Sequence, residues 1–104
     1  MDHLNDIPWK NLAPGIRGKY IHGTNTTFGY VVIEAGSILT AHHHMHEQIT
    51  HIVSGALQMK IGEIDYLLTA GMIQVIPSNT PHSALAQSDC IVIDVFSPVR
   101  DDYR

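Results

Sequence analysis

Histidine is concentrated in one short part of this chain, where it could bind a metal ion. Five of the eight histidines fall within residues 42–51, in the middle of the sequence. An expression tag does not explain a run in that position, because tags lie at a terminus. If the run continues as a strand, residues two apart share a face and lie about 6.6 Å apart. His42 and His44 could then direct imidazole nitrogens at one ion, at bond lengths of about 2.0–2.1 Å, whereas His43 would point to the opposite face.

A second segment supplies a further candidate ligand. His82 follows a stiff turn, residues 77–81, with a proline at each end, and this turn would hold its side chain in place. A donor from such a distant strand could complete a site with the first two histidines. The alternative interpretation is a chance cluster, because a lone histidine in a small β protein is usually a surface residue or a hydrogen-bonded core residue. We expect His46 at the mouth of the site, His51 in packing or at a pocket rim, and three more at the surface: His3, His22 and His43.

The elements that must position these residues are predicted to be short strands. β-Branched and apolar residues recur between turns rich in Gly, Pro, Asn and Ser. No window of a dozen residues has a clear 3.6-residue apolar period. We therefore predict an all-β sandwich or small closed barrel. The predicted strands cover residues 18–21, 28–34, 37–44, 50–54, 56–61, 64–69, 71–76, 82–86 and 89–96.

The N-terminal residues 1–17 are predicted to form an arm or strand lead-in, because they contain Pro8, Pro14 and Gly15. We expect Trp9 in this arm to pack on the barrel or on a second subunit, with a ligand contact as the alternative. The only cysteine, Cys90, cannot form an intramolecular disulfide. Because its neighbours are apolar, we predict a buried structural thiol, with a reactive thiol as the alternative.

Length and composition limit the classes of function. With 104 residues, of which 44% are hydrophobic and 15% charged, the chain is predicted to be one globular domain, residues 1–104. A net charge of −4 without any Lys/Arg cluster argues against nucleic acid as a partner. No apolar run approaches the roughly 20 residues of a membrane helix, and the polar N-terminus is unlike a signal peptide. We expect no membrane partner and a cytoplasmic protein.

Two segments together resemble the paired motifs of the cupin superfamily. Residues 36–55, GSILTAHHHMHEQITHIVSG, fit the pattern Gly, five residues, His, one, His, three, Gln, six, Gly. Residues 71–86, GMIQVIPSNTPHSALA, fit Gly, five residues, Pro, one, Asn, two, His. This chain departs from the usual cupin pattern at three positions. The pattern has Glu where this chain has Gln48, Gly where it has Asn79, and Asn where it has Ala86. Asn is a reasonable substitute for Gly, since both tolerate a left-handed backbone.

The resemblance implies a single-domain cupin, a double-stranded β-helix that forms a jelly-roll β-barrel. It also implies that His42, His44, Gln48 and His82 bind one divalent transition metal, and these ligand types suit nickel, zinc, iron, manganese and copper alike. Three neutral imidazoles and a neutral amide would leave the ion its full +2 charge, which favours an anionic ligand. The set also lacks the two-His-one-carboxylate pattern of many non-haem iron oxygenases, which makes redox chemistry a weaker expectation.

The tail DVFSPVRDDYR, residues 94–104, and the stretch HEQITHIVSG, residues 46–55, resemble pectin-degradation cupins of the KdgF type. This resemblance implies conversion of 4,5-unsaturated uronates, released by polysaccharide lyases, into linear keto uronates. It implies that Asp94, Phe96 and Arg100 line the metal pocket, and we expect them to move a proton, wall the pocket and clamp the substrate carboxylate, respectively. The alternatives are a structural strand-end carboxylate for Asp94 and a solvated tail charge for Arg100.

Three functions therefore stay open. The first is an isomerase acting on unsaturated uronates, with a small anionic sugar acid as its partner. The second is a different metal-dependent cupin enzyme, either a dioxygenase or a sugar or keto-acid isomerase. The third is a non-catalytic cupin that binds a small ligand or a metal. A homodimer is also expected, because a small barrel has edge strands to protect and because the resemblance implies dimers that pack or exchange N-terminal strands.

Overall fold

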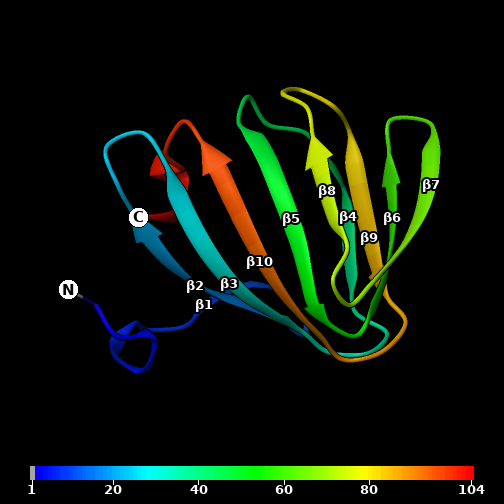
Figure 1. Ribbon diagram of the computed structural model, residues 1–104, viewed down its shortest axis with the longest axis horizontal. Helices are drawn as coiled ribbons and strands as arrows, with labels where there is room; N and C mark the ends of the chain where they lie inside the picture. The colour runs from blue at the N-terminus through cyan, green and yellow to red at the C-terminus, as the bar shows by residue number, and fades with distance from the viewer. Residues whose placement is uncertain (1) are drawn as a thin grey trace.

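The computed structural model describes residues 2–104, which form two facing antiparallel sheets (Figure 1). The six-stranded sheet has the order β1-β2-β3-β10-β5-β8, and the four-stranded sheet has the order β4-β9-β6-β7. The strands of the first sheet are β1 (Lys10–Ala13), β2 (Ile16–His22), β3 (Thr27–Ile33), β5 (Glu47–Ser54), β8 (Ile73–Ile76) and β10 (Cys90–Ser97). Those of the second are β4 (Ile38–His42), β6 (Ala56–Ile61), β7 (Ile64–Thr69) and β9 (His82–Ala86). Two short 3-10 helices, η1 (Leu4–Asp6) and η2 (Asp101–Tyr103), lie near the ends of the chain.

Alternation of side chains explains why these segments form strands. In β3, the residues from Thr27 to Ile33 are alternately covered and more exposed, and β5 and β6 follow the same period of two. The covered faces of the two sheets oppose each other and enclose one apolar core. Ile52 of β5 and Ile76 of β8 are fully buried in it, at 0% exposure. The side chains of a strand that point inward are therefore the ones available to an internal site.

The all-β prediction is confirmed, since residues 2–104 contain strands and 3-10 turns but no α-helix. The nine predicted strands correspond in order to β2 through β10, and the bounds of β6, β7 and β9 match to the residue. No helix in this part of the chain is long and apolar enough to cross a membrane.

Strand pairing explains three differences from the prediction, while other strand ends shift by one or two residues. Residues 10–13, predicted as part of an arm, form β1, because a turn with Gly15 at φ +75° returns the chain to pair with β2. β4 ends at His42 rather than at residue 44, since its pairing with β9 is irregular and stops at the His42–His82 pair. β5 begins at Glu47 rather than at residue 50, because Glu47 and Gln48 pair with the end of β10.

Three smaller predictions are confirmed. Cys90 is buried at 1% exposure, and burial raises the pKa of its thiol, as expected for a structural residue. Asn79 has a left-handed backbone with φ +58°. Trp9 packs on the barrel, with the guanidinium carbon of Arg17 4.4 Å from its ring centroid and the Lys19 Nζ 4.6 Å from it.

Strand register brings the predicted site residues to one end of the barrel. β4 and β10 end there, and β5 and β9 begin there, next to the C-terminal segment that carries η2 (Figure 1). Asp94 of β10 pairs with Thr50 of β5, and two residues on, Phe96 pairs with Gln48. The three predicted histidines lie at the same end of the four-stranded sheet.

Candidate metal centre

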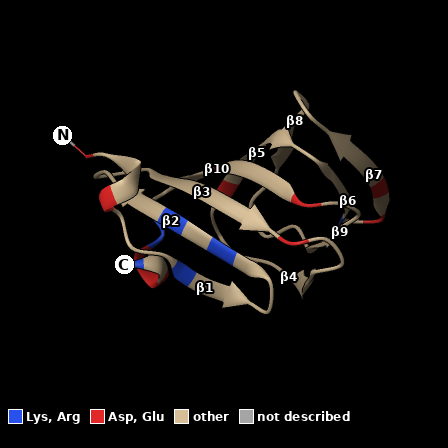
Figure 2. Ribbon diagram, turned by 90° about the horizontal axis from the view of Figure 1, so that it is seen from below, with Lys and Arg blue, Asp and Glu red and all other residues tan. Residues whose placement is uncertain are grey.

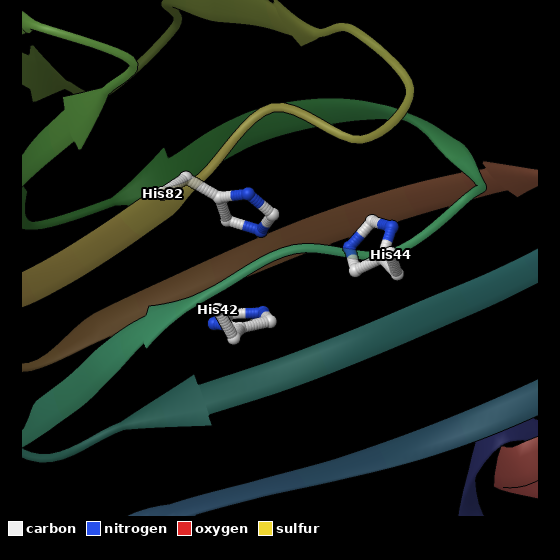
Figure 3. A group of neighbouring side chains, drawn as sticks. All are labelled: His42, His44 and His82. Carbon is white, nitrogen blue, oxygen red and sulfur yellow. The ribbon is translucent and has the colours of Figure 1, made fainter.

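Three histidines converge at this end of the barrel (Figure 3). His42 is the last residue of β4, His82 is the first of β9, and His44 lies two residues beyond β4. Their ligand nitrogens all lie within 4.8 Å of one another. Two ligands on opposite sides of an ion stand about 4.2 Å apart, so a small side-chain movement would suffice for these residues to hold one. The expected strand geometry is wrong for His44, which reaches the cluster from the irregular segment between β4 and β5.

Backbone carbonyls orient the three imidazole rings. In His42, His44 and His82 alike, Nδ1 lies 2.9–3.0 Å from a carbonyl oxygen two residues away in the sequence. A carbonyl can only accept, so Nδ1 carries the hydrogen and Nε2 keeps its lone pair. Metal-binding histidines commonly donate their other ring N–H in this way. The three rings are therefore prepared to offer Nε2 as a ligand.

Gln48 directs a fourth donor atom at the histidines. Its amide Nε2 donates to Thr50 Oγ1 at 2.9 Å and to Asp94 Oδ1 at 3.1 Å. Because the nitrogen must face these acceptors, Oε1 faces the cluster and lies 3.2 Å from His44 Nε2. In the tautomer argued above, neither of those two atoms carries a hydrogen, so two acceptors oppose each other. A cation between them would remove this repulsion, and the donor set therefore fits a metal ion.

The surroundings of His44 and His82 favour the neutral forms of these two side chains. Burial, followed by the positive charge of Arg100, lowers the pKa of His44 to about 4. Burial also lowers the pKa of His82. Because a metal binds only the unprotonated imidazole, these residues do not have to lose a proton to bind a metal near neutral pH.

Asp94 lies beside the cluster and faces the same cavity. Its Oδ1 accepts hydrogen bonds from Thr50 Oγ1 at 2.8 Å and from Gln48 Nε2 at 3.1 Å. Burial raises the pKa of Asp94 above its usual range, although both hydrogen bonds act in the opposite direction. The side chain is partly exposed, but to a cavity surrounded by protein rather than to bulk water, so it is still desolvated. A carboxyl group with a raised pKa can hold and release a proton at higher pH than usual.

Phe96 and Arg100 complete the wall on this side. Phe96 is buried, and its ring centroid lies 5.8 Å from that of His44. Arg100 is only 5% exposed, and its backbone N–H donates to Thr27 Oγ1 at 2.8 Å, which fixes the tail to β3. A solvated tail charge is therefore the wrong description of Arg100.

All seven predicted site residues line one cavity of about 60 Å³. Polar groups surround the end near the histidines, while the inner wall is apolar, with Ile16, Val31, Leu57 and Val92 among its residues. At roughly 10–15 Å³ for each water centre, the cavity has room for several waters or for one small ligand group. The structure thus brings the predicted residues together around a shared space.

Four residues at the site were not among the predicted site residues. Thr50 could have been, since it lies two residues after Gln48 on the same face of β5 and bonds to both Gln48 and Asp94. Tyr20 and Tyr103 line the cavity with ring centroids 4.7 Å apart, and Asp102 pairs with Arg100. These contacts depend on how the tail crosses the barrel end, which local sequence patterns do not reveal.

The other histidines have different surroundings. The His46 ring lies 5.4 Å from that of His44 without lining the cavity, and its Nδ1 is buried with no hydrogen-bond partner among residues 2–104. His51 lies on the outward face of β5, opposite to Gln48 and Thr50, so the pocket-rim alternative is wrong for it. His3 and His43 are exposed as predicted, whereas His22 is half-buried with Nδ1 2.9 Å from Thr27 Oγ1.

The chain is similar to known cupins in sequence and in fold. Residues 18–96 match the family model Cupin_2, described as a cupin domain. KdgF from Halomonas sp. is 34% identical, with a TM-score of 0.89 over 96% of this chain and 94% of that chain. An RmlC-like cupin from Shewanella frigidimarina NCIMB 400 has a TM-score of 0.93 over 99% and 94% of the two chains, but at 22% identity this likeness shows the fold alone. The same holds for ectoine synthase from P. lautus, with a TM-score of 0.82, 20% identity and coverage of 94% and 77%. A search of curated proteins found no match.

Proposed function

Because the chain belongs to the cupin family, we propose that it isomerises 4,5-unsaturated uronates, the products of polysaccharide lyases, to linear keto uronates. The observation that carries this proposal is that Asp94, Phe96 and Arg100 line the same cavity as the histidine cluster. The similarity to KdgF over nearly the whole chain supports it, since the tail and first motif resemble KdgF-type cupins.

The donor set suits an anionic substrate. His42, His44, His82 and Gln48 would hold a divalent ion of nickel, zinc, iron, manganese or copper, and such an ion, when bound, would supply Lewis acidity toward substrate oxygens. None of these four ligands is charged, so they would leave the positive charge of the site undiminished. A small sugar acid is the class of substrate that this charge favours.

Asp94 is proposed to move the protons of the reaction. Ring opening followed by conversion of an enol to a ketone adds and removes no atoms, so its chemistry consists of bond reorganisation and proton transfer. The hydrogen bonds from Thr50 and Gln48 to Oδ1 hold the carboxyl group in one orientation. Its raised pKa allows the group to take a proton from a substrate hydroxyl and deliver one to carbon.

Arg100 and Phe96 are proposed to orient and shield the substrate. A guanidinium group pairs well with a planar carboxylate, and Arg100 is the buried cation of this cavity. Phe96 presents an aromatic wall next to His44 and limits the entry of water. Both act on the substrate without a covalent intermediate.

The test is to follow loss of the enoate absorbance of unsaturated galacturonate with the metal-loaded protein. We expect consumption faster than the spontaneous reaction, abolished by chelation and by Asp94→Ala. His82→Ala should lose the metal and the activity, whereas His43→Ala, which alters an exposed residue of the same run, should keep both. If the metal-loaded protein accelerated the loss of no uronate, the proposal would be wrong.

One observation favours a second function. The inner wall of the cavity is apolar and its volume is about 60 Å³, which suits a cupin that binds a small ligand without transforming it. Binding of uronates without turnover would support that function, whereas metal-dependent oxygen uptake would indicate a dioxygenase.

A further inference from the structure

The guanidinium group of Arg100 is held among aromatic rings. Its central carbon lies 3.9 Å from the ring centroid of Tyr103 and 4.8 Å from that of Phe96. Such contacts fix the plane of a guanidinium group and contribute cation–π attraction. These contacts do not decide which edge of the group faces the cavity, so a further contact is needed to orient its N–H groups.

Asp102 supplies that contact. Arg100 Nε donates to Asp102 Oδ1 at 2.9 Å, and Nη2 donates to Asp102 Oδ2 at 2.7 Å. This bidentate pair uses two of the five guanidinium N–H groups. The two on Nη1 and the second on Nη2 are not used by Asp102. Arg100 lines the cavity and Asp102 does not, so the Asp102 carboxylate binds the guanidinium group from the side away from the cavity.

From this geometry we propose that Asp102 is a positioning residue, which holds Arg100 so that N–H groups of Nη1 and Nη2 that Asp102 does not use meet the carboxylate of the bound ligand. The inference rests on the proposed function for the identity of that ligand. It concerns a residue that acts through Arg100, because the Asp102 side chain is 56% exposed and outside the cavity.

Positioning and simple electrostatics predict opposite results when the charge of Asp102 is removed. If Asp102 only weakened the positive field, or competed with the ligand for Arg100, then Asp102→Asn would tighten the binding of anions. If Asp102 positions Arg100, the same change weakens binding, by about tenfold for the lost orientation. Asp101→Asn is a matched control, since Asp101 is the adjacent residue of η2 and pairs with Arg104 at the surface, at 2.9 Å.

The experiment compares the metal-loaded wild type with Asp102→Asn, Asp102→Glu and Asp101→Asn. We expect Asp102→Asn to raise the KM for unsaturated galacturonate and the Kd for galacturonate about tenfold, with a smaller change in kcat and no loss of metal. Asp102→Glu should recover part of the affinity, and Asp101→Asn should behave as wild type. Tighter or unchanged binding in Asp102→Asn would overturn the proposal.

A second readout does not depend on activity. The chain has three arginines, so the Nε–H signals in a nitrogen-15 NMR spectrum can be assigned with Arg100→Lys. We expect a slowly exchanging Arg100 signal that is lost in Asp102→Asn and kept in Asp101→Asn. An Arg100 signal unaffected by Asp102→Asn would overturn the positioning role. If the protein showed no turnover but its Arg100 Nε–H still exchanged slowly in a way that depends on Asp102, the result would count against the proposed reaction alone.

Discussion

At the scale of a single residue, Asp94 is an acid whose burial raises its pKa and disfavours the ionised carboxylate. The property that suits it to proton transfer therefore costs stability. We predict that Asp94→Asn raises the free energy of unfolding by about 1 kcal/mol, because Asn keeps an acceptor for Thr50 and Gln48 without a buried charge. Activity should fall by roughly 10²- to 10⁴-fold, the usual contribution of an acid–base group. Thermal unfolding and turnover, with metal content as the control, test this. A variant that is less stable and fully active would contradict both parts.

His44 makes the stability of the metal-free protein depend on pH. The unfolded histidine binds a proton near pH 6.5, whereas the folded one does so only at about 4. Between these values the unfolded state binds more protons, so stability is retained above about pH 6.5 and falls as the pH drops toward 4. We predict that the Tm in the presence of a chelator decreases over this range, and that His44→Gln reduces the slope. An equally steep slope in His44→Gln would assign the effect to other groups.

At the scale of elements, β2 and β3 make room for an aromatic ring on the inner face of the barrel. A Cβ on Gly29 would lie 2.7 Å from a ring carbon of Tyr20, and a Cβ on Gly18 would lie 2.6 Å from its hydroxyl oxygen. Both glycines are needed for space, since neither has a positive φ. Tyr20 in turn packs on Tyr103 of the tail, so these two strands help to fix the C-terminal wall of the site.

We therefore predict that Gly29→Ala destabilises the fold by about 1–3 kcal/mol through overpacking. Gly23→Ala is the matched control, because its Cβ would come no closer than 3.5 Å to a neighbouring atom. Denaturant unfolding measures both. In a Tyr20→Leu background the cost of Gly29→Ala should shrink, and an undiminished cost there would show that the ring is not the obstacle.

The strands were predictable because their signals are local. The alternation in β6 and the turn residues on either side of it predict both ends of that strand correctly. Gly15 and Asn79 take the left-handed conformations that their residue types allow. β1 was not predictable from its own four residues, because only pairing with β2 makes it a strand. The same division applies to the site. His42 and His82 could be placed by motif spacing, whereas the Arg100–Asp102 pair depends on where the tail crosses the barrel.

At the scale of the whole molecule, the central part of the outer face of the six-stranded sheet is apolar. Two cross-strand rows run over β3, β10, β5 and β8, and neither contains a charged residue. The basic residues of this sheet lie on β1 and β2 (Figure 2). The first row is Phe28, Val95, Ile49 and Val75, and the second is Tyr30, Ile93, His51 and Ile73. Contiguous apolar surface of this kind marks an interaction site, and an uncharged face can pack on a second copy of itself without like-charge repulsion.

We therefore propose that the expected homodimer forms through this face. Ile49 lies near its centre and is 40% exposed, so Ile49→Lys would place a charge in the interface on both subunits. We predict a monomer for this variant in light scattering, at concentrations where the wild type is a dimer. Leu67→Lys is the matched control, because Leu67 is 54% exposed on the four-stranded sheet and its change should leave the dimer intact. A two-fold interface must be weakened by a change at its own centre. A monomeric wild type would therefore contradict the proposal, and so would a dimer that dissociates with Leu67→Lys but not with Ile49→Lys.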